Sequence, residues 1–258
     1  MKIASYSGSN NPVKGSFSTQ DGDLIRLDFT QGAHGRAFCG NQAYDLPDPK
    51  NQLVSVSNMA ATLEITGPQG MPAPMGQVVV RTLKARGDIT MPVLRVEKLD
   101  LAHSSLTANE VSGPKNETDP EVEADRITNI RMLDSNLITK GDLVFIAIEG
   151  DDKRPSLVKA GYLEGMTTQG HLTLQANDLA VYVLDAHEVR VTDPAGCRVG
   201  KTFCDRVFQQ NSLGQPVRKV APVRDQDLLS GLSRLVADGN EIEDLGEPAE
   251  LDAQGFEM

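Results

Sequence analysis

The chain has 258 residues, of which 39% are hydrophobic and 24% charged, and its formal net charge is −11 at pH 7. These fractions are ordinary for a folded globular protein, so wholesale disorder is excluded. The cysteines are Cys39, Cys197 and Cys204, an odd number at wide spacing. That usage argues against a disulfide framework and favours a reducing compartment.

We find no sequence signal for export or for membrane insertion. No apolar run approaches the roughly 20 residues that span a bilayer, and residues 1–12 lack the apolar core of a secretory signal. We therefore expect no membrane contact and a cytoplasmic location. The cytoplasm could be that of the protein's own cell or of an infected host, and a place inside a virion is included in this expectation.

The acidity belongs to the C-terminal end of the chain. Residues after Arg234 contain eight acidic residues and no Lys or Arg, whereas residues 1–224 hold 26 acids and 24 bases. Residues 188–224 are basic, with seven bases against three acids. A basic segment thus directly precedes an acidic tail, which points to a contact between the two or to a charged partner.

In chain order, alternating apolar and polar residues predict strands at 23–29, 53–66, 77–84 and 89–101. A Pro/Gly loop at 67–76 separates the second and third of these strands. We interpret residues 1–106 as an N-terminal β domain. The polar stretch 107–123, with two prolines, is interpreted as a linker.

The most legible stretch lies between residues 137 and 165. Residues 143–148 are six apolar residues in a row, which is typical of a buried strand. A polar turn at 149–155 and a second strand at 156–163 then predict a β-hairpin. Shorter strands are expected at 171–174, 179–184 and 188–192, the last alternating like an antiparallel strand. Together they predict a small β-barrel domain at residues 124–222.

No repeat of fixed period is visible in the sequence, which argues against solenoid and propeller folds. The expected fold class is therefore mainly β, with two small β-barrel or sandwich domains, a short C-terminal helix and an acidic tail.

The helix is predicted within residues 223–258, which also hold the tail. Leu228, Leu232 and Leu235 share one face at helical spacing, and Asp225 and Asp227 lie where a helix N-terminus favours negative charge. A helix of about three turns is marginal alone. It must dock on its own domain or on a neighbouring subunit.

Three patterns could carry chemistry, and each has a plainer interpretation. Residues 195–202, AGCRVGKT, fit a loose P-loop pattern, but too little chain follows to complete an α/β sheet. Cys197 and Cys204 lie seven apart without the close ligand pairs of zinc sites. His34 and Cys39 share a Gly-rich loop, where a free cysteine is usually a small buried hydrophobe. We therefore expect no catalytic residue, no cofactor and no metal.

The function expected from these observations is that of a non-enzymatic structural or assembly protein, acting through protein–protein contacts. Its partners would be other protein subunits in a homo-oligomer or a larger, phage-like or virion-like particle. The alternative is a single-stranded nucleic-acid-binding protein with an acidic C-terminal tail. Against it stands the aromatic content, with no Trp, four Tyr and seven Phe, because stacking platforms need exposed aromatic rings.

The residues expected to bind partners fall into three groups: bases of the basic segment, the apolar face of the helix, and residues of the acidic tail. They are Arg198, Lys201, Arg206, Arg218 and Lys219; Leu228, Leu232 and Leu235; and Glu241, Glu243, Asp244 and Phe256. The hypothesis is that the basic segment receives the acidic tail, within one chain or between chains.

Overall fold

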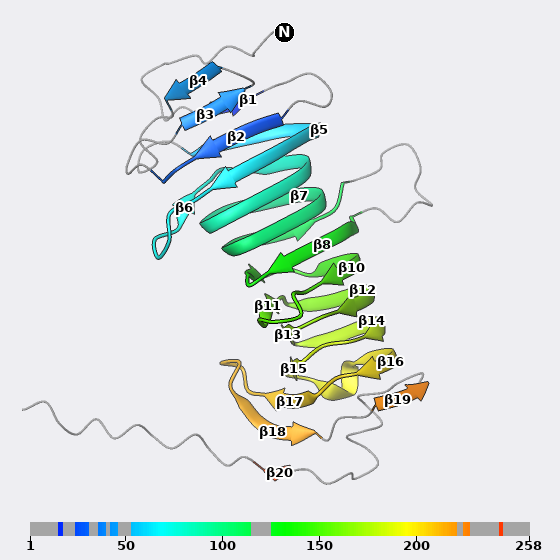
Figure 1. Cartoon of the computed structure of the whole chain (residues 1–258). Helices are drawn as coiled ribbons and strands as arrows, with labels where there is room; N and C mark the ends of the chain where they lie inside the picture. The colour runs from blue at the N-terminus through cyan, green and yellow to red at the C-terminus, as the bar shows by residue number, and fades with distance from the viewer. Residues whose placement is uncertain are drawn as a thin grey trace, which may run out of the picture.

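Parallel strands, stacked one above another, make up most of the molecule (Figure 1). The fold is a computed structural model that describes residues 15–17, 24–30, 36–39, 42–45, 53–114, 125–220, 224–227 and 243–244. For the short strands at 15–17, 36–39, 42–45, 224–227 and 243–244, and for Val220, only the backbone is described. Among the described residues, no helix is long and apolar enough to cross a membrane.

Two columns of strands run through the C-terminal half. Column A consists of β8 (Ile127–Leu133), β10 (Leu143–Glu149), β12 (Tyr162–Gln169), β14 (Asp178–Leu184) and β16 (Arg198–Phe203). Column B consists of β9 (Asn136–Thr139), β11 (Ser156–Lys159), β13 (Leu172–Ala176), β15 (Glu188–Val191) and β17 (Arg206–Gln210). Within each column, every strand pairs in parallel with the next. One strand of each column, with its turns, forms one rung of a β-solenoid.

The stack continues into the N-terminal half through β5 (Val54–Thr66), β6 (Ala73–Pro74) and β7 (Val78–Ser112). The 35-residue β7 winds through successive rungs and pairs in parallel with β5, β6, β8 and β9 (Figure 1). The buried apolar side chains form one cluster from Ile25 to Val207. Residues 107–112 belong to β7, and the domain boundaries expected from the sequence stay predictions.

Both ends of the stack carry antiparallel strands. At the N-terminal end, β1 (Gly15–Phe17) and β2 (Leu24–Asp28) add in parallel to β5, and β3 (Arg36–Cys39) and β4 (Gln42–Asp45) follow in antiparallel. At the C-terminal end, β18 (Pro216–Val220) pairs with β17, β19 (Arg224–Asp227) with β16 and β20 (Glu243–Asp244) with β18.

The mainly β class is confirmed, and the barrel or sandwich arrangement is not found. The expected hairpin at 143–163 is wrong, because β10 pairs with β8 and β12 while β11 pairs with β9 and β13, all in parallel. Likewise, the expected antiparallel strand at 188–192 is β15, which is parallel to both neighbours. A run of apolar residues is typical of strands buried in parallel sheets, and such a run does not specify its partner.

The expectation against a solenoid is also wrong, and the rung lengths explain why. Paired residues are 18, 20, 16 and 18 positions apart at β8–β10, β10–β12, β12–β14 and β14–β16. Between β7 and β8 the offset is 31, because the chain between them includes residues 113–126. The period therefore varies from rung to rung, and no fixed repeat could be detected.

The predicted C-terminal helix is not supported where it can be assessed. Asp225 and Asp227, expected at its N-terminus, lie in β19. Leu228, Leu232 and Leu235 lie outside the described residues.

Core packing between rungs is tight at Phe145. Its side chain is fully buried and faces Gly165, its register partner on β12. A Cβ atom at Gly165 would overlap the Phe145 ring. The glycine therefore makes room for the largest fully buried side chain of the core.

We expect Gly165→Ala to lower the free energy of unfolding by about 1–3 kcal/mol, because the added methyl group must displace a buried ring. Urea denaturation followed by circular dichroism measures the change. Gly141→Ala is the matched control, because the nearest atom to its added Cβ is the Asn109 carbonyl oxygen at 3.5 Å, an ordinary contact. Equal stability of the two variants would contradict this packing.

Candidate functional site

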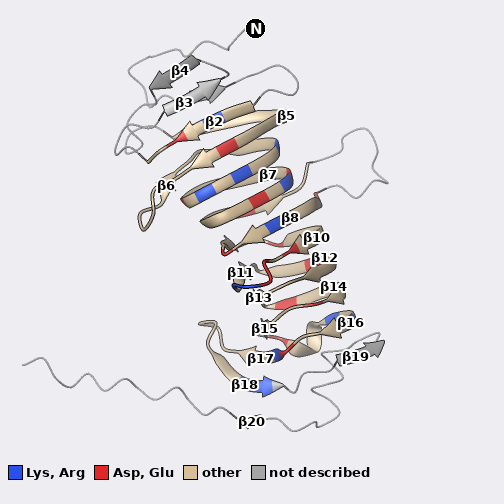
Figure 2. Ribbon diagram, in the orientation of Figure 1, with Lys and Arg blue, Asp and Glu red and all other residues tan. Residues whose placement is uncertain are grey.

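The basic residues expected to bind partners gather at the C-terminal end of the stack. Arg198 and Lys201 lie on β16, Arg206 on β17, and Arg218 and Lys219 on β18. Figure 2 shows the basic part of β18 in blue at this end. Leu228, Leu232, Leu235, Glu241 and Phe256 lie outside the described residues.

The strand β20 brings two of the expected acidic residues to the basic strand. In the antiparallel ladder between β18 and β20, Arg218 lies opposite Asp244 and Lys219 opposite Glu243. Opposite charges at facing positions of an antiparallel pair are favourable. In this register two positions of each segment face each other within one chain. The hypothesis that the basic segment receives the tail stays a prediction.

Two of the other bases already have partners. Arg206 contacts Glu188 at 3.8 Å and the His187 ring, and Arg198 donates a hydrogen bond to the Tyr162 hydroxyl at 3.5 Å. Glu188 is also bonded by Arg190 at 2.6 Å. Arg206 is thus held in an ion-pair network on column B, which reduces its availability to a phosphate or to an acidic partner.

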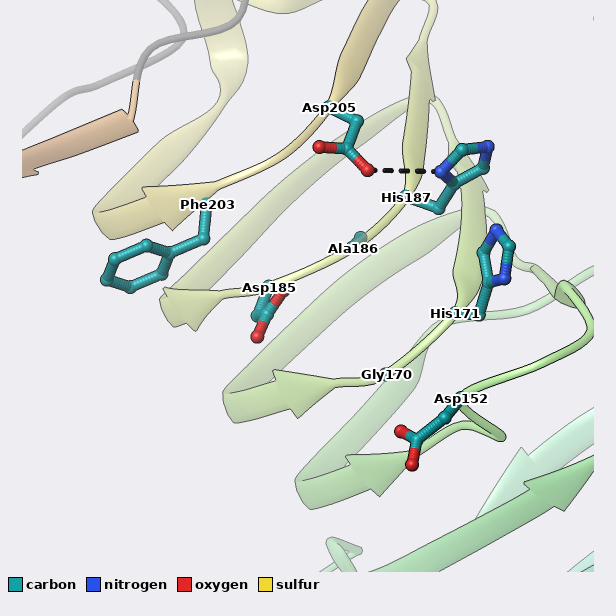
Figure 3. A pocket seen from close by; sticks show the side chains of 8 residues that line it. All are labelled: Asp152, Gly170, His171, Asp185, Ala186, His187, Phe203 and Asp205. Atoms are coloured by element: carbon teal, nitrogen blue, oxygen red, sulfur yellow. Dashed lines mark hydrogen bonds and ion pairs between the residues drawn. The ribbon is translucent and has the colours of Figure 1, made fainter.

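An open pocket of about 640 Å³ lies beside these bases, along the turns that join column A to column B. Figure 3 shows His171 and His187 side by side on consecutive turns, with Phe203 projecting to the other side. The pocket is lined mostly by acidic and imidazole side chains, and its lining residues are Asp152, Gly170, His171, Asp185, Ala186, His187, Phe203 and Asp205.

Both nitrogens of the His187 ring in this pocket contact neighbouring groups. His187 Nδ1 lies 3.1 Å from Asp205 Oδ2, and its Nε2 contacts the Arg206 guanidinium. Because arginine can only donate, Nε2 accepts and Nδ1 carries the proton that it donates to Asp205. His171 packs edge-on against His187, with ring centroids 4.2 Å apart, and its Nε2 is buried. His187 therefore offers no lone pair to a substrate.

The two cysteines whose side chains the structure describes, Cys197 and Cys204, are poor nucleophiles. Burial raises the pKa of Cys197 to about 12 and that of Cys204 to about 11, so both remain thiols near neutral pH. The P-loop-like motif has the wrong geometry as well: Gly200, Lys201 and Thr202 lie inside β16 instead of leading into a helix. Among the described residues, no group of three or more His, Cys, Asp or Glu side chains could hold a metal ion.

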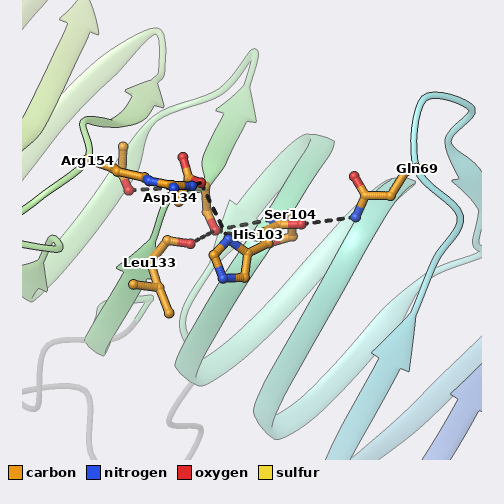
Figure 4. Close-up of polar contacts among 8 residues, drawn as sticks. Gln69, His103, Ser104, Leu133, Asp134 and Arg154 are labelled. Carbon is orange, nitrogen blue, oxygen red and sulfur yellow. Dashed lines mark hydrogen bonds and ion pairs between the residues drawn. The ribbon is translucent and has the colours of Figure 1, made fainter.

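A second polar cluster lies on the same side of the stack, nearer its middle (Figure 4). Asp134 accepts a hydrogen bond from Arg154 at 2.7 Å and lies 3.4 Å from His103 Nδ1. The backbone beneath is held by serines, since Ser135 Oγ donates to the Leu133 carbonyl at 2.7 Å and accepts from the Ser104 amide at 3.2 Å. These contacts fix the corners where the chain turns at positive φ, at His103 and Asp134.

The hydrogen bond from Arg154 lowers the pKa of Asp134 below its ordinary value, and the His103 contact lowers it further. The folded chain thus favours the carboxylate, which contributes stability above the unfolded pKa and loses it as pH falls through the folded value. We expect Arg154→Gln to raise this pKa toward the ordinary value, as measured by NMR pH titration. Lys153→Gln is the control and should leave it unchanged; a pKa that stays low in Arg154→Gln would contradict this contact.

An apolar row crosses the outer face of column A. It consists of Ile146, Met166 and Tyr182, whose exposed fractions are 39%, 42% and 59%. The strand registers place these three side chains next to one another on adjacent strands. Ile146 and Met166 lie between the paired residues Phe145–Gly165 and Ala147–Thr167. Met166 and Tyr182 lie between Gly165–Val181 and Thr167–Val183. We call them the outer apolar row.

The next strand, β16, has a glycine beside the last residue of this row. Gly200 on β16 lies beside Tyr182, and a Cβ there would be 2.5 Å from the Tyr182 carbonyl oxygen. The missing side chain leaves the tyrosine ring exposed. Exposed apolar side chains that gather in one patch mark contact surfaces more often than scattered ones do.

Sequence reasoning missed the histidine pair and the outer apolar row. His171 and His187 are 16 positions apart, which equals the offset between β12 and β14. The same offset separates Met166 from Tyr182. The 16-residue spacing could have indicated both pairs, but only to a reader who already knew the number of residues in this rung.

The fold and its surfaces define an elongated parallel β-solenoid (Figure 1) whose conspicuous surfaces are a basic end and an apolar row. Comparison with protein-family models, with curated proteins and with solved structures finds no match for this chain.

Proposed function

We propose that this chain is a non-enzymatic structural or assembly subunit that acts through contacts with other protein subunits. The observation that carries the proposal is the outer apolar row on β10, β12 and β14. Three large apolar side chains in register on one sheet face gain most when another protein covers them. A virion or phage particle as the setting stays a prediction.

The geometry of the pocket supports the same proposal. A hydrolytic or transfer enzyme needs a nucleophile or a base with a free lone pair. His187 is occupied on both nitrogens, and the described thiols are buried and protonated. The buried apolar residues of the stack form one continuous cluster from Ile25 to Val207, so that each rung is stabilised by its neighbours.

Replacing the outer apolar row should weaken subunit association. We expect Met166→Ser/Tyr182→Ser to weaken self-association at least about tenfold, equivalent to about 1.4 kcal/mol, because anchor residues at interface centres contribute on this scale. Sedimentation velocity over a concentration series measures the change. The control is Leu213→Ser, which removes an apolar side chain that is 77% exposed in a turn. Unaltered association of the double variant would count against the proposal.

The pairing of β18 with β20 suggests a second contact, mediated by charge. We expect deletion of residues 239–258 to change the solution mass or the stability at low salt, because the basic strand then loses its acidic partner. Added salt should diminish the difference between the two forms, since it screens exposed charges. Light scattering and thermal melts of both forms provide the measurement. Equal mass and equal stability would contradict a role for the tail.

The nucleic-acid alternative makes a different prediction for the same two proteins. A fluorescent single-stranded oligonucleotide would bind in a salt-sensitive way, and more strongly once the acidic tail is removed. Phe208 lies opposite Lys219 in the β17–β18 ladder. This pairing places one half-buried aromatic residue beside a basic residue. Such binding would replace the assembly proposal.

A further inference from the structure

The C-terminal end of the stack is formed by β16 and β17, the last parallel strands of the two columns. Each uses one side to pair with the rung before it. The other side presents a row of backbone N–H and C=O groups, which in any sheet is a template for a further strand. What covers this edge therefore decides whether the stack ends here.

The cover over β16 is short and irregular. The strand β19 pairs with it only at Lys201, Thr202 and Phe203, with a register shift between the last two. Within the described part of the chain, residues 198–200 have no strand on this side, although the pairing of β16 with β14 on its other side begins at Arg198. Half of the edge strand is thus uncovered by described residues.

The cover over β17 has the chemistry of a protective edge. The strand β18 pairs with it through a register shift between Gln209 and Gln210. It begins with Pro216 and carries Arg218 and Lys219. Proline, basic side chains and bulges are the devices by which sheet edges discourage further pairing. The two strands β18 and β19 act together as a terminal cover, which we call the C-terminal cap.

We infer that the edge formed by β16 and β17 is a self-association surface, which fits the same edge of a second copy of this chain and is occupied by the C-terminal cap in the single chain. This surface is distinct from the outer apolar row and from the β18–β20 charge contact, so the inference goes beyond the proposed function.

Symmetry makes the second copy a fitting partner. A two-fold axis perpendicular to the two columns places β16 beside β16 of the copy and β17 beside β17, antiparallel in both columns. The edge accepts antiparallel strands already, since both β19 and β18 pair in that direction. The buried Val199 and Val207 at this end would then continue one core into the next.

The opposite end of the stack does not offer the same surface. There β3 pairs in antiparallel with β2 over four positions and β4 with β3 over four positions, both without a register shift. Tail-to-tail pairing about a two-fold axis uses the C-terminal edge of both copies and therefore ends at two copies. The expected product is a dimer and not a fibre.

The test uses the full chain with Arg218→Pro, which removes a backbone N–H from β18 and restricts its backbone. The solution mass is measured at about 1 M salt, where the Debye length is roughly 3 Å and the charge contact between β18 and β20 is screened. We expect a twofold increase in mass relative to the parent chain. A synthetic peptide of residues 212–227, added in excess, should return the mass to that of the parent.

Ser212→Pro is the matched control. Ser212 lies in the turn closed by the hydrogen bond from the Gly214 amide to the Asn211 carbonyl at 2.9 Å, where proline is well tolerated. This variant should keep the mass of the parent. Hydrogen exchange at β18 shows directly whether the cap has detached, and circular dichroism shows that the β content is kept.

Two outcomes would overturn the inference. In the first, the β18 amides exchange rapidly in Arg218→Pro while the mass remains that of the parent, so the exposed edge does not bind a copy. In the second, the variant forms particles larger than two chains that the peptide does not dissolve. If Arg218→Pro leaves β18 protected, Val217→Pro/Lys219→Pro is measured by the same criteria. Since the outer apolar row is intact in all these variants, failure here leaves the proposed function standing.

Discussion

The parallel, in-register pairing of each rung with the next is the constraint on which the rest of the structure depends. Neighbouring strands in a sheet lie about 4.8 Å apart, so residues one rung apart in sequence become direct neighbours in space. Their side chains then form rows along the stack. The outer apolar row and the histidine pair are both made of residues one rung apart.

The ion pairs illustrate the effect. On the outer face, Arg26 lies beside Glu64 at 2.8 Å and Glu64 beside Lys84 at 3.5 Å, each on the next strand of the stack. Lower in the stack, Arg131 lies between Asp100 and Glu149. Figure 2 shows basic and acidic positions interspersed over β2, β5, β7 and β8. Each exposed pair contributes little alone, but a row in which signs alternate avoids like charges at facing positions.

How far the sequence predicts this fold depends on whether the information is local. The strands at 143–148 and 179–184 were located correctly, because an apolar run or an alternating pattern is a property of a few consecutive residues. Their partners were not, because pairing direction depends on residues 16–20 positions away. The turn predicted at 149–155 fits a hairpin loop and a solenoid corner equally well.

The candidate sites follow the same division. Arg218 and Lys219 were singled out from composition alone, and β20 does place acidic positions opposite them. The histidine pair and the outer apolar row could not be found this way, since each is made of single residues from separate rungs. The rings of His171 and His187, for example, are in contact although the two residues lie on consecutive turns. The hydrogen bonds that occupy His187 likewise come from the next rung.

The variation in rung length has a consequence for how such a molecule can change its size. Because offsets of 16, 18 and 20 residues are accommodated at the corners while the strands stay in register, a coil can be gained or lost without disturbing the columns on either side. Each such event would change the height of the stack by about 4.8 Å and would lengthen or shorten every surface row by one position. The number of rungs therefore sets the length of the molecule in steps of one strand spacing.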